Sequence, residues 1–215
     1  MLRLARVALF LLLAVTILAG GALAWVTTFP DTLRHPAERL LAASLGREVR
    51  IEGPLSITPG RVTTVELQGL HIAAPAWARA DDLLAVDRLR VGVDLRTYLR
   101  HRTIDITELV VDAPRVALER NRELQTSWPS GGGGEGTAPP RLSVGRIEIA
   151  DGRIEALDAP SGLDLAATLV ASNDAGLKLD GSGKVGTDPL QVALHVGALE
   201  RLIEGDAPLR VDGSI

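Results

Sequence analysis

The pattern of apolar positions begins with an unbroken hydrophobic run over residues 7–26, in which Thr16 is the only polar side chain. At about 1.5 Å per helical residue, this run is long enough to cross a hydrocarbon core of about 30 Å. Arg3 and Arg6 precede it, which favours a cytoplasmic N-terminus. We therefore predict a transmembrane signal-anchor over residues 1–26. Its membrane-embedded residues include Val7, Leu11, Leu12, Leu13, Ile17, Leu18 and Trp25.

A cleavable signal peptide is the alternative interpretation of the same segment. Arg3 and Arg6 form a basic n-region, residues 7–18 an apolar h-region, and Ala22-Leu23-Ala24 resembles a cleavage site. Both interpretations carry the rest of the chain across the membrane. They differ in whether the product stays tethered.

After a short connection, the apolar spacing predicts one amphipathic helix. Pro36 suits the first helical turn, and Gly46 suits the C-terminal cap. Between them, apolar residues recur at helical spacing: Ala37, Leu40, Leu41 and Leu45. This stripe either packs on the following sheet or lies on the membrane surface beside the anchor.

From Glu48 onward the apolar period becomes two, which predicts strands. Residues 88–95 give the clearest half-buried strand, because Leu89, Val91, Val93 and Leu95 alternate with charged or small residues. The alternation shifts phase around Gly69, as a β-bulge would allow, and Leu109 and Val111 are out of phase with Ile104 and Ile106. Val116 and Leu118 follow Pro114. Arg88 and Arg90 fall on the polar face, which indicates a solvated strand surface, with anionic headgroup binding as the alternative.

Residues 128–140, WPSGGGGEGTAPP, interrupt the strands with a density of Gly and Pro that no regular element tolerates. No G-K-[ST] follows the four glycines, so a phosphate-binding loop is excluded. Alternation returns after residue 141, and Asp151-Gly152 predicts a hairpin turn. The last residues stop in mid-pattern, so we expect further strands beyond them.

Together these elements predict a mostly β protein with an extended antiparallel sheet, incomplete at the C-terminus. The expected organisation is an anchor (1–26), a helix with a sheet unit (27–127), a linker or loop (128–140) and further strand repeats (141–215). Apolar strand faces usually form a packed core, although a curved sheet could instead enclose an apolar groove. The alternation alone does not separate these two arrangements.

Composition narrows the class of function. The 215 residues carry a net charge of −4 and no cysteine, so disulfides and cysteine-based metal sites are excluded. The slight acidity argues against a nucleic-acid partner. Only 3% of residues are aromatic, so the apolar faces are mainly aliphatic.

No combination of residues points to catalysis. The histidines His35, His71, His101 and His195 have no partner at the spacing of metal ligands. Asp81 and Asp82 are adjacent in an expected loop, where a solvated turn is the simpler interpretation than an acid/base pair. We therefore predict a protein that is not an enzyme and that holds no metal or cofactor.

Several segments in this order resemble the N-terminal region of the AsmA family. The apolar anchor is followed by Ser44-Leu45-Gly46-Arg47 and by VRIEGPLSI over residues 49–57. Gly69-Leu70, RLRVGVDL over 88–95 and IDITELVVDAP over 104–114 come next. Val116-Ala117-Leu118, IEIADGRI over 147–154 and Asp188-Pro189-Leu190 complete the resemblance, which covers nearly the whole chain. These motifs are short and degenerate.

The resemblance implies a single-pass inner-membrane protein of a Gram-negative bacterium whose bulk is periplasmic. It also implies a bridge-like architecture, in which an apolar β-groove binds phospholipid acyl chains and serves phospholipid transport and outer-membrane assembly. The residues expected to line such a groove are Val65, Leu67, Leu89, Val91, Val93, Leu95, Ile104, Ile106, Val116 and Leu118. Expected partners are the inner membrane, phospholipid and components of outer-membrane assembly. The alternative is a structural or chaperone-like envelope factor that contacts outer-membrane proteins through a sheet edge.

Overall fold

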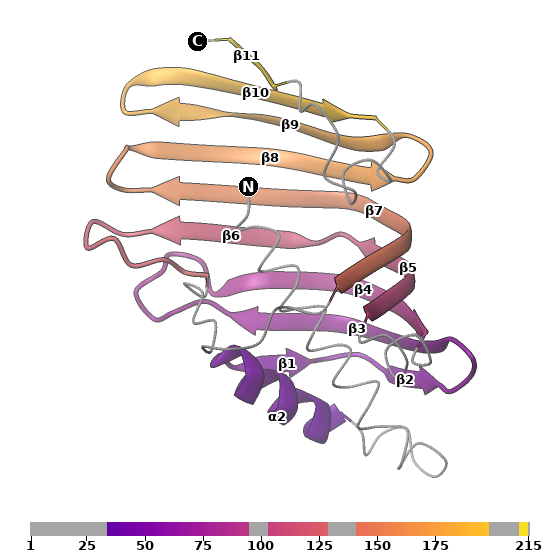
Figure 1. Cartoon of the computed structure of the whole chain (residues 1–215). Helices are drawn as coiled ribbons and strands as arrows, with labels where there is room; N and C mark the ends of the chain where they lie inside the picture. Colours follow the sequence, from indigo (N-terminus) through magenta and orange to yellow (C-terminus); the bar gives the residue numbers. More distant parts are fainter. Residues whose placement is uncertain (1–33, 95–102, 129–140, 198–210, 215) are drawn as a thin grey trace.

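The computed structural model describes residues 34–94, 103–128, 141–197 and 211–214. These residues form one α-helix and a single sheet of eleven strands (Figure 1). The elements, in chain order, are α2 (Arg34–Leu45), β1 (Val49–Ile51), β2 (Leu55–Thr58), β3 (Thr63–Ala73), β4 (Asp82–Asp94), β5 (Thr103–Asp112), β6 (Arg115–Arg120), β7 (Arg141–Asp158), β8 (Leu163–Ser172), β9 (Gly176–Val185), β10 (Asp188–Val196) and β11 (Val211–Ser214). The prediction of a mostly β protein is therefore confirmed.

Some predictions fall outside the described residues. These are the anchor over 1–26, Leu95 and nearly all of the Gly/Pro-rich segment. Within the described ranges, no helix combines the length and the apolar character that a membrane crossing needs.

The single helix α2 is held against the sheet as the apolar stripe predicts. Ala37 and Leu41 are buried, and Glu38 Oε1 accepts a hydrogen bond from the Ile51 amide at 2.9 Å. Gly46 has a φ of +63° and its amide donates to the Ala42 carbonyl at 2.8 Å, which confirms the C-terminal cap. The inclusion of Leu40 in the buried stripe was wrong, because its side chain is 43% exposed. The contact with the sheet covers a narrower arc of the helix than the sequence pattern indicates.

The sheet order is β1-β3-β4-β5-β7-β8-β9-β10-β11, with β2 paired to β3, and β6 paired to both β4 and β7. The prediction of a purely antiparallel sheet was wrong, because β7 runs parallel to β5 and to β6. β5 and β6 follow one another along the same side of β4 and run in the same direction. β7 begins beside the start of β5, where Arg141 pairs with Thr103, and it runs parallel to both strands.

The predicted hairpin at Asp151-Gly152 was also wrong, because β7 continues through both residues. Ile149 pairs with Ala171 and Gly152 with Leu169, so β7 contains one extra residue at this point. Asp151 takes a φ of +52°, as in a β-bulge. On the other side, the Arg153 amide donates to the Pro114 carbonyl at 2.7 Å. The bulge therefore faces the break between β5 and β6. β7 is the parallel partner of both strands and spans this break.

The predicted phase shifts have two different origins. The shift between Ile106 and Leu109 is a bulge, because the β4–β5 register changes between Gly92 and Val93. The shift at Gly69 is not a bulge between β3 and β4, because Gln68 pairs with Arg88 and Leu70 with Val86. Both strands change phase together there, and Gly69 takes a φ of +62°. Glycine suits this position because it adopts a positive φ without steric cost.

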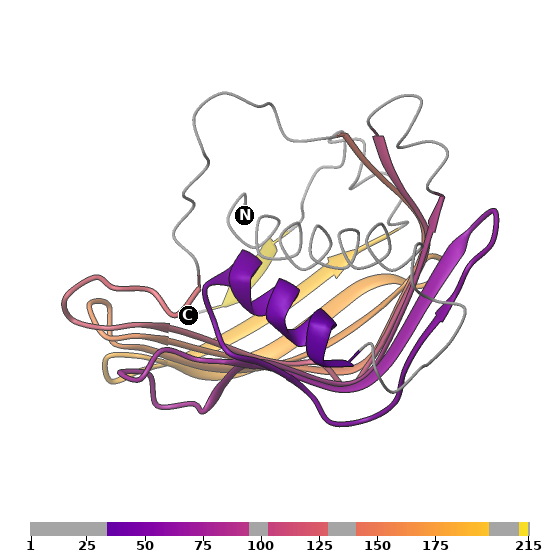
Figure 2. The same ribbon diagram turned by 90° about the horizontal axis from the view of Figure 1, so that it is seen from below.

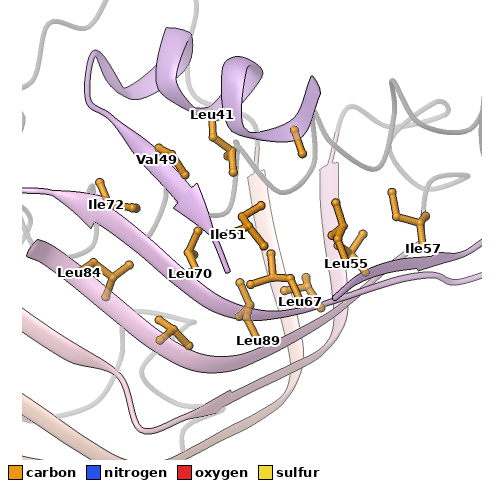
Figure 3. Close-up of a cluster of buried hydrophobic side chains, with 14 of the residues drawn as sticks. Leu41, Val49, Ile51, Leu55, Ile57, Leu67, Leu70, Ile72, Leu84 and Leu89 are labelled. Atoms are coloured by element: carbon orange, nitrogen blue, oxygen red, sulfur yellow. The ribbon is translucent and has the colours of Figure 1, made fainter. Parts of the chain in front are cut away.

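The sheet bends around the side on which α2 lies (Figure 2). We call this side the inner face and the opposite side the outer face. Figure 3 shows Leu41 of α2 close to Val49 and Ile51, with Leu70 and Leu67 beneath them. These side chains belong to one buried cluster formed by α2 and strands β1 to β5. The packed core therefore occupies the N-terminal part of the inner face.

Candidate functional site

The inner face is a continuous aliphatic surface that the strand register extends beyond the core. One row of paired residues crosses seven strands: Leu67, Leu89, Val111, Ile149, Ala171, Leu177 and Val196. A second row crosses eight: Val49, Ile72, Leu84, Val116, Ile154, Ala167, Gly181 and Val192. Paired residues in a sheet point to the same face, so both rows lie on one side.

Eight of the ten predicted groove residues lie on this inner face. Six of them are between 0% and 7% exposed and belong to the core cluster: Val65, Leu67, Leu89, Val91, Val93 and Ile106. Val116 and Leu118 are partly buried against the same cluster. Ile104 belongs to β5 and pairs with Leu142, and Leu95 lies outside the described residues. The structure therefore unites these residues, and it places most of them in a packed core.

A second group of inner-face residues lies beyond the core cluster, on β8 to β10. These side chains are only half-buried, and none belongs to the cluster: Leu163, Leu165, Leu169, Leu177, Leu179, Leu190, Val192 and Leu194. The sequence pattern marks them as strand residues and does not single them out. Their distance from α2 in the sheet order distinguishes them, and that order depends on strand pairing.

The outer face is polar and carries cross-strand ion pairs. Arg90 lies 3.4 Å from Glu66, Arg88 3.6 Å from Asp112, and Arg146 3.7 Å from Glu108. Each pair joins residues in direct register on neighbouring strands. The interpretation of Arg88 and Arg90 as a solvated strand face is thus confirmed. The sheet therefore separates an aliphatic inner face from a charged outer face.

The titratable groups form structural contacts. His71 Nδ1 lies 2.7 Å from Asp82 Oδ2, and His71 Nε2 lies 3.9 Å from Glu52. Asp82 is the first residue of β4, so only Asp81 fits the predicted solvated turn. Among the described residues, no group of three or more His, Cys, Asp or Glu side chains could hold a metal ion. His195 is exposed on the outer face, where it pairs with Lys178.

No protein-family model, no curated protein and no solved structure matches the chain. The resemblance to the AsmA family therefore stays a prediction from the sequence.

Proposed function

We propose that the protein binds lipid acyl chains along the inner face of β7 to β10. The observation that carries this proposal is that the two rows of paired aliphatic residues on the inner face continue past the packed core. There they reach half-buried leucine and valine side chains. At about 4.8 Å between neighbouring strands, β7 to β10 provide about 14 Å of apolar surface across the strands. This length accommodates a large part of an extended acyl chain.

The chemistry of this surface suits acyl chains better than compact ligands. Away from Asp158 and Asp188 at the loop end, its side chains are mainly Leu, Ile, Val and Ala, which offer apolar area without hydrogen-bonding groups that fix an orientation. Burial of apolar area is favourable by about 25 cal/mol per Å² and is not directional. A tail can therefore occupy several registers along such a surface, as lipid transport requires.

The cellular setting belongs to the same proposal. The N-terminal apolar run supports an inner-membrane anchor with the sheet in the periplasm. The AsmA resemblance supports a role in phospholipid transport and outer-membrane assembly. Lipid would then pass from the inner membrane onto the apolar face of the sheet.

The test compares two aspartate substitutions in the detergent-purified full chain by native mass spectrometry. Leu179→Asp places a charge on the inner face between Leu169 and Leu194, at the centre of the half-buried group of β8 to β10. Val170→Asp places one on the outer face of β8, where Val170 is already 49% exposed. We expect co-purified phospholipid with the unmodified chain and with Val170→Asp, and its loss with Leu179→Asp. Absence of phospholipid from the unmodified chain, or equal retention by both variants, contradicts the proposal.

A second experiment remains informative if Leu179→Asp does not fold. A photoreactive amino acid at position 179 retains apolar character and crosslinks whatever lies on the inner face. We expect lipid adducts in membranes from position 179 and none from position 170. Protein adducts in place of lipid would favour the chaperone-like alternative.

A further inference from the structure

One end of the strands gathers four connections into a continuous border, which we call the loop rim. It consists of residues 74–81, 121–127, 159–162 and 186–187. The register joins the last three segments, because Arg120 pairs with Asp158, Asp158 with Leu163, and Leu163 with Val185. Residues 74–81 adjoin them through the hydrogen bonds from the Arg79 and Ala80 amides to Glu119. Figures 1 and 2 both show these connections at the left end of the sheet.

Exposed apolar side chains concentrate on the loop rim. Five large hydrophobic side chains are exposed among the described residues, and three of them lie on or directly beside this rim. Trp77 is 36% exposed in the β3–β4 loop, Leu124 is 65% exposed after β6, and Val185 is 41% exposed at the end of β9. The other two, Leu40 and Val170, lie on α2 and on the outer face of β8. The rim therefore differs in character from the rest of the exposed surface.

The loop that carries Leu124 is built to hold this side chain outward. Leu124 has a φ of +64°, in the left-handed region that L-residues other than glycine rarely adopt. Asn121 Oδ1 accepts hydrogen bonds from the amides of Glu123 at 3.0 Å and Gln125 at 2.9 Å, and the Leu124 amide donates to the Asn121 carbonyl at 3.1 Å. Backbone strain that the surrounding contacts enforce is typical of functional positions.

A buried carboxylate ties the Trp77 loop to the Leu124 loop. Glu119 is 7% exposed, and its two oxygens accept hydrogen bonds from the Arg79 amide at 2.9 and 3.0 Å and from the Ala80 amide at 2.9 Å. Ser127 lies at the other end of the Leu124 loop. Its amide donates a hydrogen bond to the Glu119 carbonyl at 2.8 Å, and its hydroxyl oxygen accepts one from the Glu119 amide at 2.8 Å. Both loops are thereby fixed to β6.

We propose that the loop rim docks onto the headgroup layer of a lipid bilayer, with Trp77 and Leu124 inserted into it. Tryptophan and leucine at exposed loop positions match the composition of segments that lie in a membrane interface. The exposed charges nearby balance, Arg79 and Arg122 against Asp81 and Glu123, so the apolar tips carry the match. The apolar tips stand on separate connections, and β6 and β9 are about 14 Å apart at the usual strand spacing. A protein interface needs a contiguous apolar centre, whereas a fluid headgroup layer admits separate tips.

This inference concerns a different surface from the proposed acyl-chain site, so each can fail without the other. The inner face governs lipid retained by the purified chain. The loop rim governs the position of the sheet relative to a bilayer.

The experiment uses the absence of cysteine from the chain, which lets a single introduced cysteine carry a spin label. The full chain is reconstituted in vesicles of phosphatidylethanolamine and phosphatidylglycerol, with the label at Leu124→Cys or Trp77→Cys. Val170→Cys serves as the control, because this exposed apolar residue lies on the outer face away from the rim. Collisions with oxygen, which concentrates in lipid, and with a water-soluble nickel chelate then report depth.

We expect labels at positions 124 and 77 to lie about 5–10 Å below the headgroup boundary, with raised oxygen collisions and reduced chelate collisions relative to position 170. Equal chelate collisions at all three positions overturn the proposal. Protection from the chelate without a gain in oxygen collisions also overturns it, because that result indicates a protein contact.

Discussion

Arg120 and Asp158 face each other across the parallel pair formed by β6 and β7. The Arg120 Nη2 atom lies 2.7 Å from Asp158 Oδ2, and Arg120 Nε donates a second hydrogen bond to Oδ1. The Ser161 hydroxyl also donates to Asp158. These hydrogen bonds, the one from Arg120 foremost, lower the pKa of Asp158 from 3.8 to about 2. The contact fixes the end of β7 to β6 at the loop rim.

We expect this contact to make stability depend on acid. A carboxyl group whose pKa is lowered by folding stabilises the fold above its unfolded pKa, and this contribution is lost as the pH falls through the folded pKa. For Asp158 the loss falls between about pH 4 and pH 2. Thermal unfolding followed by circular dichroism between pH 5 and pH 2 should show this step, and Asp158→Asn should remove it. The control Asp164→Asn changes an exposed carboxylate on the outer face of β8 and should keep the step. An unchanged profile for Asp158→Asn contradicts the assignment.

Replacement of Glu119 by glutamine should loosen the Trp77 loop. The amide nitrogen of glutamine cannot accept the hydrogen bond that Glu119 Oε2 accepts from the Arg79 amide, and it places an N–H group against that amide. We expect a loss of about 1–3 kcal/mol in the free energy of unfolding, as is typical when a buried hydrogen-bonding group loses its partner. Hydrogen exchange should accelerate at the amides of Arg79 and Ala80.

Glu123→Gln is the matched control for that substitution, because Glu123 is exposed in the same loop. In Glu123→Gln, the rate of hydrogen exchange at the amides of Arg79 and Ala80 should equal that of the unmodified chain. Unchanged protection of these two amides in Glu119→Gln would show that the carboxylate does not hold the loop.

The sequence predicted the elements well because local alternation reports which face of a strand is buried. Leu89, Val91 and Val93 alternate with polar residues, and all three lie in the core. Gly46 ends the helix for a reason that depends only on its own backbone. Strand direction was not predictable in this way, because a strand has the same alternation in parallel and antiparallel pairs. It depends on which end of β5 lies beside the start of β7, and alternation does not report that.

The sequence predicted the chemistry of the candidate site, an aliphatic strand face, but not its position in the sheet. The groove residues inferred from alternation, such as Val65 and Ile106, share the expected face but lie in the packed core. Which part of a continuous apolar face is covered depends on how near each strand lies to α2 in the sheet order, and the alternation within a strand does not report that order. The half-buried leucines of β8 to β10 have the same local pattern as the core residues. Only the sheet order separates the two groups.

Asp151 offers a direct test of the bulge that replaced the predicted hairpin. Its φ of +52° is accessible to aspartate and glycine at low cost, and a β-branched residue is strongly disfavoured there. We expect Asp151→Val to lower the free energy of unfolding by about 1–2 kcal/mol and Asp151→Gly to be tolerated. Urea denaturation of both variants measures the difference. Equal stability of the two variants would show that the positive φ is not required.

Gly183 should be essential to the pairing of β8 and β9 under the candidate lipid-binding face. A Cβ atom at this position would lie 2.0 Å from the Asp164 carbonyl oxygen and 2.8 Å from Leu165 Cα, so β8 and β9 would have to separate. The atoms that the new methyl group would meet are backbone atoms, so no flexible side chain can move to make room for it. We therefore expect Gly183→Ala to lower the free energy of unfolding by about 2 kcal/mol or more. Gly197→Ala is the control, because a Cβ at Gly197 would meet nothing within 4 Å. It should change stability by no more than about 0.5 kcal/mol in the same urea titration. Equal urea midpoints for the two variants would mean that β8 and β9 do not approach this closely.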